Sequence, residues 1–537
     1  MPSPSATDPQ LEASIARNSL RYDLTPYTSN PYPQTQPARL AAIARMFGLR
    51  TTPVEKARVL ELGCAGGGNI IPLAARYPES RFLGVDLSRT QVAAGRARIA
   101  SLGLANIEIQ CKSFTELGQD VEPADYIICH GVYSWVPAPV REALLGICRR
   151  LLSPTGVAVI SYNVLPGWRS LQMLRDCFLL HSGYSGAGKP PAASAREILA
   201  FLKEAVRDEG PWKQLLTAWS ERVKHLPDDY IVHEFLEDTN EPCTFRDFVT
   251  AAERHRLAYL GDCDLPSMIV DNQPPALAEK LRGLGGNRQV ATEQYLDMVT
   301  GRTFRHTLLI ASERAGELNL NLAPQSIHDL HFLSGPDLRP EGGADPSAFV
   351  DARGRRLTST SPAVVAALTQ LVSRYPATAS VDDLISATPE TAWGEEQRAQ
   401  LLDALHRMVT TGWLVPSSTP IRPAPYRAGD RPLAWPIARL DAREGRLTTT
   451  TQRHETAQID PLAQAILQLL DGTRDAPAIE AAVIELLRAG RLNFHRDGQR
   501  ITDKAVLAAL VPEQTRSSLA SLARLALLEA PIASGAD

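Results

Sequence analysis

Short apolar runs alternate with amphipathic stretches in the first third of the chain. The runs have the length and continuous apolar character of buried parallel strands: RVLELG (58–63), RFLGVD (81–86), IEIQCKS (107–113), DYIICH (125–130) and GVAVISY (156–162). Helical patterns separate them over 69–77, 88–102 and 139–152, and Ser88 stands where an N-cap is expected. Strands that alternate with helices predict an open, mostly parallel α/β sheet with both faces covered.

The pattern changes after residue 165. Residues 165–245 are helical in pattern, with a break rich in Gly, Ser and Pro at 182–194. Two later apolar runs follow, LAYLGDCD (257–264) and TFRHTLLIA (303–311), the first of them preceded by a helix from Phe245. A final antiparallel strand of this kind would complete a seven-stranded sheet. We therefore expect residues 165–245 to be a helical insertion into the α/β domain.

Two C-terminal segments match each other in sequence. DARGRRLTST (351–360) and DAREGRLTTT (441–450) are identical at seven of ten positions, and apolar helical patterns follow at 363–372 and 461–470. The segment LNFHRDGQRITD (492–503) alternates around Asp497–Gly498, which predicts a β-hairpin. Helices that end in a hairpin favour a repeated winged-helix-like α+β module. Because residues 431–537 carry 13 basic and 13 acidic residues, contact with protein is favoured over contact with DNA.

The chain of 537 residues is too long for one hydrophobic core. We predict a disordered, polar tail over 1–19 and an α/β domain over 20–315 with its insertion at about 165–245. Two winged-helix-like modules are expected to follow, over 316–425 and 426–537.

Composition narrows the function classes. Hydrophobic residues make up 44% and charged residues 22%, and the net charge of −4 gives no general attraction to nucleic acid or to anionic membranes. The seven cysteines form no C-x-x-C pair, which is typical of reduced thiols in the cytoplasm. The N-terminus lacks the pattern of a signal peptide, and no uncharged apolar run reaches the roughly 18 residues of a membrane span. The 11 histidines show no metal-ligand spacing, so we expect no metal.

The sharpest motif is ELGCAGGGN (61–69), between the first strand and its helix. Its glycines permit close approach of a ligand to backbone amides at a helix N-terminus. A tight strand-to-helix turn without a ligand is the plain alternative, but carboxylates at the ends of the first and second strands favour a nucleoside cofactor. The expected cofactor-binding residues are Glu61, Gly63, Cys64, Gly66, Gly67, Asp86, Leu87, Ser113, Phe114 and His130.

The main rival is a dinucleotide-binding turn, G-x-G-x-x-G. That pattern requires glycine where Ala65 stands, and it leaves the acidic Glu61 unexplained, so S-adenosyl-L-methionine is favoured over NAD. One feature departs from the methyltransferase pattern. After the third strand the chain has Lys112, Ser113 and Phe114, where many methyltransferases have an acidic residue for the adenine amine; Phe114 is expected to pack on the adenine ring instead.

Residues 22–311 resemble bacterial protein-lysine methyltransferases that carry a methyltransferase regulatory middle domain, a group that modifies outer-membrane proteins. The residues that carry the resemblance are YDLTPYTSNPYPQTQPARL (22–40), ELGCAGGGN, DYIICHGVYSWVP (125–137), SYNVLPGW (161–168), HEFLEDTNEPCTFRDFV (233–249) and GRTFRHTLL (301–309). The resemblance implies a class I methyltransferase fold and a lysine acceptor in a protein substrate. It is compatible with an outer-membrane protein methylated in the cytoplasm before export, and with a homodimer.

Methyl transfer needs a neutral lysine amine, and reaching that form at pH 7 costs about 4–5 kcal/mol. An apolar channel lowers this cost by desolvation. The aromatic and amide side chains just past the fourth and fifth strands lie where ligands bind in open α/β sheets; these candidate catalytic residues are Tyr133, Trp135, Tyr162, Asn163 and Trp168. The alternative is that the aromatics pack the insertion onto the sheet. His130 is a candidate for a cofactor contact through its backbone, for proton uptake or for a structural role.

Two other functions remain open at this point. One is a methyltransferase for small molecules, with the C-terminal part serving assembly. The other is a catalytically silent protein that binds S-adenosyl-L-methionine and regulates partners. The glycine turn is compatible with both, whereas the aromatic residues at the sheet edge favour chemistry.

Overall fold

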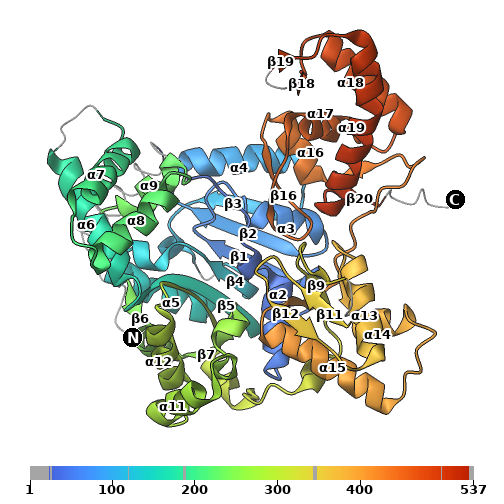
Figure 1. Cartoon of the computed structure of the whole chain (residues 1–537). Helices are drawn as coiled ribbons and strands as arrows, with labels where there is room; N and C mark the ends of the chain where they lie inside the picture. The colour runs from blue at the N-terminus through green and yellow to red at the C-terminus, as the bar shows by residue number, and fades with distance from the viewer. Residues whose placement is uncertain are drawn as a thin grey trace.

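Seven strands form the central sheet of the computed structural model, which describes residues 23, 27–118, 120–184, 189–342, 347–496 and 499–530. Their order is β3-β2-β1-β4-β5-β8-β7, and β8 is antiparallel to both of its neighbours. The strands are β1 (Arg58–Leu62), β2 (Arg81–Asp86), β3 (Ile107–Cys111), β4 (Ala124–Cys129), β5 (Leu152–Leu165), β7 (Leu257–Asp262) and β8 (Phe304–Ala311). The predicted class I methyltransferase sheet is therefore confirmed (Figure 1).

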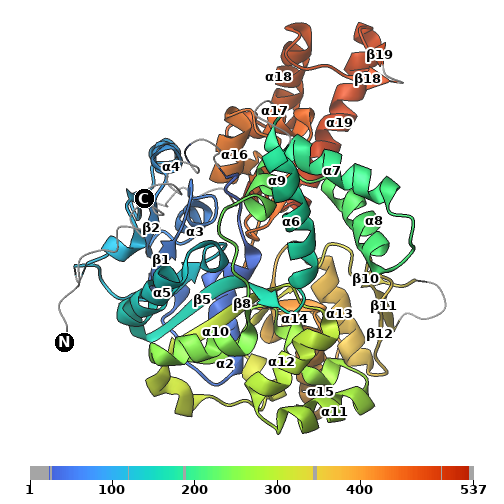
Figure 2. The same cartoon turned by 90° about the vertical axis from the view of Figure 1, so that its left-hand side faces the viewer.

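Helices cover both faces of this sheet. Helices α3 (Ile70–Arg76) and α4 (Arg89–Leu102) lie on one face. Helices α5 (Ala138–Leu151) and α10 (Phe245–Arg254), which are side by side in Figure 2, lie on the other, as right-handed crossovers on either side of β1 require. The Ser88 hydroxyl accepts a hydrogen bond from the Gln91 amide and caps α4, as expected. Helix α2 (Pro37–Met46) packs against both β5 and the C-terminal strand β14.

The helical insertion follows β5. It consists of α6 (Arg169–Tyr184), α7 (Pro191–Ala205), α8 (Pro211–Val223) and α9 (Asp228–Phe235), and it has a small hydrophobic core of its own. Figure 2 shows these four helices grouped together. The chain then returns to the sheet through β6 (Cys243–Thr244), which pairs with the end of β5. The expected insertion is thus present, although residues 185–188 of its predicted break lie outside the described residues.

A buried ionic cluster fixes β8 to the elements around it. The fully buried guanidinium of Arg305 donates to Asp297 at 2.8 Å, to Glu293 at 3.1 Å and to Asp262 at 3.4 Å. Asp262 comes from β7, and Glu293 and Asp297 come from α12 (Gln289–Thr300), which follows α11 (Pro275–Gly285). Since side chains alternate along a strand, this anchorage turns Phe304 and His306 to the opposite face of the sheet.

The chain beyond residue 320 forms two groups of helices and short strands. The first contains β9 (His331–Ser334), β10 (Arg339–Pro340), β11 (Ala348–Val350), β12 (Arg356–Thr358), α13 (Pro362–Ser373), β13 (Ala379–Ser380), α14 (Val381–Ser386), α15 (Glu395–Thr410) and β14 (Leu414–Ser417). The second contains β15 (Leu433–Ala434), α16 (Pro436–Arg443), β16 (Thr448–Thr450), β17 (Thr456–Gln458), α17 (Pro461–Leu469), α18 (Ala476–Arg488), β18 (His495–Arg496), β19 (Gln499–Arg500), α19 (Lys504–Arg524) and β20 (Leu528–Glu529). The predicted hairpin is present as β18 and β19, but its turn, Asp497–Gly498, lies outside the described residues.

The ten-residue sequence match does not mark equivalent positions in these two groups. Residues 351–360 begin in the turn between β11 and β12 and include β12, which is the second strand of that hairpin. Residues 441–450 begin in the last turn of α16 and end in β16, which starts a hairpin with β17. The match is therefore not evidence for a duplicated domain, because the same residue types serve a turn in one place and a helix end in the other.

We predict that Arg305→Ala lowers the free energy of unfolding by about 3–5 kcal/mol, because it leaves the buried Glu293 without its cation and leaves Asp262 and Asp297 with Arg302 alone. Urea denaturation followed by circular dichroism measures this change. The control is Lys224→Ala, which removes an exposed ion pair with Glu221 and should leave the midpoint unchanged. An Arg305→Ala protein as stable as the wild type would contradict the structural role given to this cluster.

Candidate functional site

The turn between β1 and α3 is closely packed on both sides. Gly63 has a φ of +75°, and a Cβ atom there would lie 2.5 Å from Cγ2 of Val132. At Gly68 a Cβ atom would lie 2.1 Å from the carbonyl oxygen of Ser29, whose hydroxyl accepts a hydrogen bond from the Gly68 amide at 2.7 Å. Side chains at these positions would displace either the loop after β4 or the N-terminal segment 27–36, so glycine is required for the close approach.

Asp86 at the end of β2 holds this turn in shape. One carboxylate oxygen accepts from the Ala65 amide at 2.8 Å and the other accepts from the Ser88 amide at 2.9 Å. Burial raises the pKa of Asp86 above its ordinary value, and these backbone hydrogen bonds oppose the rise. A carboxylate has about four lone-pair sites, so Asp86 and the adjacent Leu87 can still serve ligand hydroxyl groups at the carboxyl edge of β2.

Glu61, near the end of β1, is a buried carboxylate with one free oxygen. Oε1 accepts from Nδ2 of Asn69 at 2.8 Å, whereas Oε2 is buried without a hydrogen-bond partner among the described residues. Burial raises the pKa of Glu61 to about 8, and the negative charge of Asp86 adds to the rise. Because a buried polar atom without a partner is costly, this oxygen marks a place for a cationic or hydrogen-bond-donating ligand group.

Asn69 connects Glu61 to two distant parts of the chain. Its Oδ1 atom accepts from the Tyr32 amide at 2.9 Å and lies 2.8 Å from Nε2 of His454, while Nδ2 also donates to the Thr35 hydroxyl at 3.1 Å. Sequence reasoning assigned no role to Asn69 beyond membership of the motif, and none to His454. No sequence signal connects His454 to a residue 385 positions away.

Four half-buried rings meet beside Glu61 at the carboxyl edge of the sheet, and we refer to them as the aromatic cluster: Tyr32, His130, Phe304 and His306. The ring of His130 lies parallel to that of His306, with centroids 5.2 Å apart, and 3.8 Å from the ring of Tyr32. Phe304 meets both histidines edge-on.

The surroundings of these histidines keep them uncharged. Burial lowers the pKa of His130 to about 4 and the pKa of His306 well below its ordinary value. Nδ1 of His130 and Nε2 of His306 are buried and have no hydrogen-bond partner among the described residues. The cluster therefore presents neutral imidazole nitrogens that are available to a ligand.

Sequence reasoning identified His130 but missed the other three rings. The available signal was the spacing of Phe304 and His306, which places two rings on one face of a strand end.

The sheet separates the predicted catalytic residues into two sets. Asn163 lies directly opposite Phe304 in the β5–β8 ladder, on the side of the aromatic cluster, and it is buried. Tyr162 points to the other face, where its ring stacks on Phe248 of α10 at 4.1 Å and its hydroxyl bonds Thr307. Tyr133 packs edge-on against the same two rings, so both tyrosines lie in the core beneath α10.

The two predicted tryptophans are also separated. Trp168 is buried in the small core of the helical insertion. Trp135 is half-buried at the end of the short 3-10 helix Tyr133–Trp135. The structure thus places Asn163 on the same face as the aromatic cluster, and it places Tyr133, Tyr162 and Trp168 in hydrophobic cores away from it.

The remaining predicted residues surround the glycine turn or follow β3. Cys64 is buried, and a Cβ atom at Gly66 would lie 3.0 Å from Oε1 of Gln91, while Gly67 has a φ of +77°. Ser113 caps the short 3-10 helix Phe114–Glu116, and the ring of Phe114 is buried. The structure therefore places these residues along the carboxyl ends of β1, β2 and β3.

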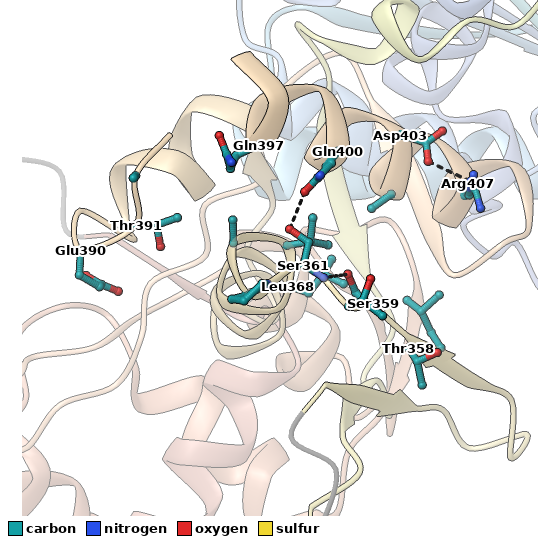
Figure 3. Close-up of a pocket in the computed structure, with 17 residues that line it drawn as sticks. Thr358, Ser359, Ser361, Leu368, Glu390, Thr391, Gln397, Gln400, Asp403 and Arg407 are labelled. Carbon is teal, nitrogen blue, oxygen red and sulfur yellow. Dashed lines mark hydrogen bonds and ion pairs between the residues drawn. The ribbon is translucent and has the colours of Figure 1, made fainter. Parts of the chain in front are cut away.

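Two cavities lie near or within the C-terminal part. One of about 300 Å³ is enclosed by segment 27–31, glycines 66–68 and Thr448–Thr450 of β16, so the second C-terminal group closes over the outer side of the glycine turn. The other, of about 930 Å³, lies between α13, α15 and the end of β12, and it contains none of the predicted site residues (Figure 3). Hydroxyl and amide side chains line it, and Ser361 donates to Gln400 across it.

Three family models match the chain. Residues 59–156 match "Methyltransferase domain", residues 227–311 match "Predicted methyltransferase regulatory domain", and residues 430–527 match "PKMT, C-terminal winged helix domain". The last match supports the predicted winged-helix fold of the second C-terminal group.

Some of the matched relatives span nearly the whole chain. An uncharacterized protein of Rickettsia prowazekii, RP789, is 32% identical over 520 residues, which cover 93% of this chain and 91% of the relative. The structure of PKMT2 from Rickettsia typhi in complex with AdoHcy has a TM-score of 0.83 at 28% identity, over 94% of this chain and 100% of that one. A trans-aconitate 2-methyltransferase of Methylobacterium nodulans is 31% identical over 162 residues, covering 30% of this chain and 56% of the relative.

The cofactor is S-adenosyl-L-methionine, as predicted in preference to NAD. The described residues fit it: the free Oε2 atom of Glu61 suits the α-ammonium group, Asp86 suits the ribose hydroxyls, and glycines 66–68 line the cavity of about 300 Å³. No helix among the described residues has both the length and the apolar character needed to cross a membrane.

We predict that S-adenosylhomocysteine binds several-fold more tightly for each pH unit from 6 to 8, with a plateau above about 8. The ammonium group requires ionised Glu61, and burial raises the pKa of that carboxyl to about 8 in the free protein, so binding must expel a proton below this pH. Calorimetry across this pH range measures the effect. Glu61→Gln should bind more weakly and with a flat profile, and a flat profile in the wild type would refute the role of Glu61.

Proposed function

The chain belongs to the PKMT family of S-adenosyl-L-methionine-dependent methyltransferases, and from this premise we propose that its acceptor is the side-chain amine of lysine in another protein. The family name stands for protein-lysine methyltransferase. The observation that carries the proposal is the aromatic cluster, because it combines apolar walls with neutral imidazole nitrogens beside the cofactor site.

A lysine amine attacks a methyl group only in its neutral form. The rings of Tyr32 and Phe304 exclude water from the amine and lower its pKa by desolvation. His130 and His306 stay uncharged at pH 7, so neither repels an ammonium ion, and each has a nitrogen that can accept a hydrogen bond from the amine. Asn163 lies on the same face and can orient the amine through its amide oxygen.

Residues at the glycine turn bind and position the cofactor. When bound, S-adenosyl-L-methionine supplies an electrophilic methyl group on a sulfonium. Glu61 holds the ammonium end and Asp86 holds the ribose, which together fix the position of the cofactor relative to the aromatic cluster. Alignment and exclusion of water then account for most of the rate enhancement, because an in-line displacement needs little acid–base assistance.

Three segments that flank the site favour a polypeptide as the substrate. The N-terminal segment is bonded to the helical insertion through Thr28 and Asp229, and Tyr27 meets His233 of α9 edge-on at 5.4 Å. The winged-helix domain is the third segment beside the site, after the N-terminal segment and the helical insertion. The family resemblance favours an outer-membrane protein that is methylated in the cytoplasm before export, and the enzyme as a homodimer is a further part of this proposal.

A small-molecule acceptor is the alternative. The likeness to trans-aconitate 2-methyltransferase covers only 30% of this chain, so it bears on the methyltransferase fold and leaves the acceptor open.

We predict that the purified enzyme transfers labelled methyl groups to polypeptide in bacterial extracts and that the label maps to lysine. Mass spectrometry of lysines in the cytosolic and outer-membrane fractions is the measurement. Lys→Arg substitution at the mapped positions should remove the label. Label recovered only in small molecules would favour the alternative acceptor, and no turnover with normal cofactor binding would favour a silent regulatory protein.

We predict that His306→Ala lowers kcat about fivefold, because it removes one hydrogen-bond acceptor for the neutral amine, a net interaction of about 1 kcal/mol, while the Kd for S-adenosylhomocysteine changes little. The matched control is Thr307→Val, which changes the neighbouring β8 residue on the opposite face and should keep kcat near the wild-type value. Equal kcat values for the two variants would exclude the aromatic cluster as the acceptor site.

A further inference from the structure

The winged-helix domain contacts the methyltransferase domain through the loop 451–455 between β16 and β17. The guanidinium of Arg76, at the end of α3, donates to the carbonyl oxygens of Gln452 and Pro420. In the same loop Arg453 donates to the Ser334 carbonyl at 2.9 Å and lies over the ring of Tyr375. These contacts place the next residue, His454, in the interior at 3% exposure.

His454 reaches the residue that holds Glu61. Its Nε2 atom lies 2.8 Å from Oδ1 of Asn69. The Asn69 amide donates through Nδ2 to the Glu61 carboxylate, so Oδ1 must be the acceptor and His454 must donate. Burial, with a contribution from Arg76, lowers the pKa of His454 to about 3, which keeps it a neutral Nε2–H donor.

The backbone of His454 is in a rarely used conformation. Its φ is +62°, in the left-handed region that only a few per cent of non-glycine residues adopt. Such a conformation persists where the surroundings determine it, and it often accompanies a functional constraint. Here it turns the imidazole toward Asn69, which gives a second observation that the side chain is required at this place.

We propose that His454 is a positioning residue for the cofactor site and that it acts through Asn69 on Glu61. Two donors, the Tyr32 amide and His454 Nε2, share Oδ1 of Asn69 and fix the amide with Nδ2 toward Glu61. This orientation occupies Oε1 and leaves Oε2 for the ammonium group of the ligand. Without His454 the amide has one orienting donor fewer, and the Glu61 carboxylate is held less firmly.

The proposal has a thermodynamic consequence for the domains. If docking of the loop 451–455 strengthens cofactor binding, then cofactor binding strengthens docking of the loop by the same factor. The winged-helix domain would therefore sense whether the cofactor site is occupied. This inference concerns the cofactor only, so it holds whether the acceptor is lysine or a small molecule.

Two pairs of variants test the proposal in the full-length protein. His454→Ala should raise the Kd for S-adenosylhomocysteine about fivefold, the effect of one net hydrogen bond. His454→Gln carries the same unfavourable backbone but keeps an N–H donor, and it should restore most of the affinity. Should the alanine variant fail to fold, His454→Asn suits the left-handed backbone and is too short to reach Asn69.

The pH profile separates positioning from simple loss of stability. The groups around Glu61 are Asp86, Tyr32, Asn69 and the thiols Cys64 and Cys129, and only the Asn69 bond changes in these variants. Loss of this bond raises the pKa of Glu61, so the plateau of binding should move above pH 8 in His454→Ala and stay in place in His454→Gln.

A docking control and an exchange measurement complete the test. Glu444→Gln weakens a different interdomain contact, with Arg98 of α4, and should leave the Kd and its pH profile unchanged. In the wild type, S-adenosylhomocysteine should slow amide exchange in residues 448–458, and in His454→Ala it should not. Wild-type affinity and pH profile in both His454→Ala and His454→Asn would overturn the proposal.

Discussion

A buried carboxylate with one unpaired oxygen is the constraint on which the site depends. Glu61 lies near the carboxyl end of strand β1, where burial raises its pKa and leaves Oε2 without a partner among the described residues. Such a group is tolerated when a ligand completes it, because an unpaired buried oxygen costs free energy in the empty protein. The glycines, Asp86 and Asn69 are arranged around this place: the glycines permit the close packing of the turn, Asp86 accepts a hydrogen bond from its backbone, and Asn69 holds the Glu61 carboxylate.

The two faces of β5 and β8 carry different tasks. Arg305 and its three carboxylates anchor β8 on the α10 side, where Tyr162 and Tyr133 also pack. Phe304 and His306, which flank Arg305 in β8, lie on the opposite face of the sheet and contact His130. The buried ionic cluster on one face of β8 thus fixes the positions of the Phe304 and His306 rings on the other. A binding site for a desolvated lysine amine requires such fixed positions.

The glycine turn is also the point where three distant segments meet. The N-terminal segment bonds Gly68 and Asn69, the helical insertion holds that segment through Asp229, and the winged-helix domain reaches Asn69 through His454. Each of these segments covers a part of the methyltransferase domain that would otherwise be open to water.

The sequence by itself determined the sheet, the cofactor turn and the helical insertion, because these depend on local patterns: apolar strand runs, the glycines between Glu61 and Asn69, and the caps of helices. It placed Glu61 and Asp86 correctly at strand ends. Only the tertiary structure decided which aromatic residues share the site, since one residue of register separates Asn163, on the side of His130, from Tyr162, on the side of α10. It alone decided that His454 lies against Asn69 and that the two matching C-terminal segments occupy different elements, because contacts across hundreds of residues leave no local pattern in the chain.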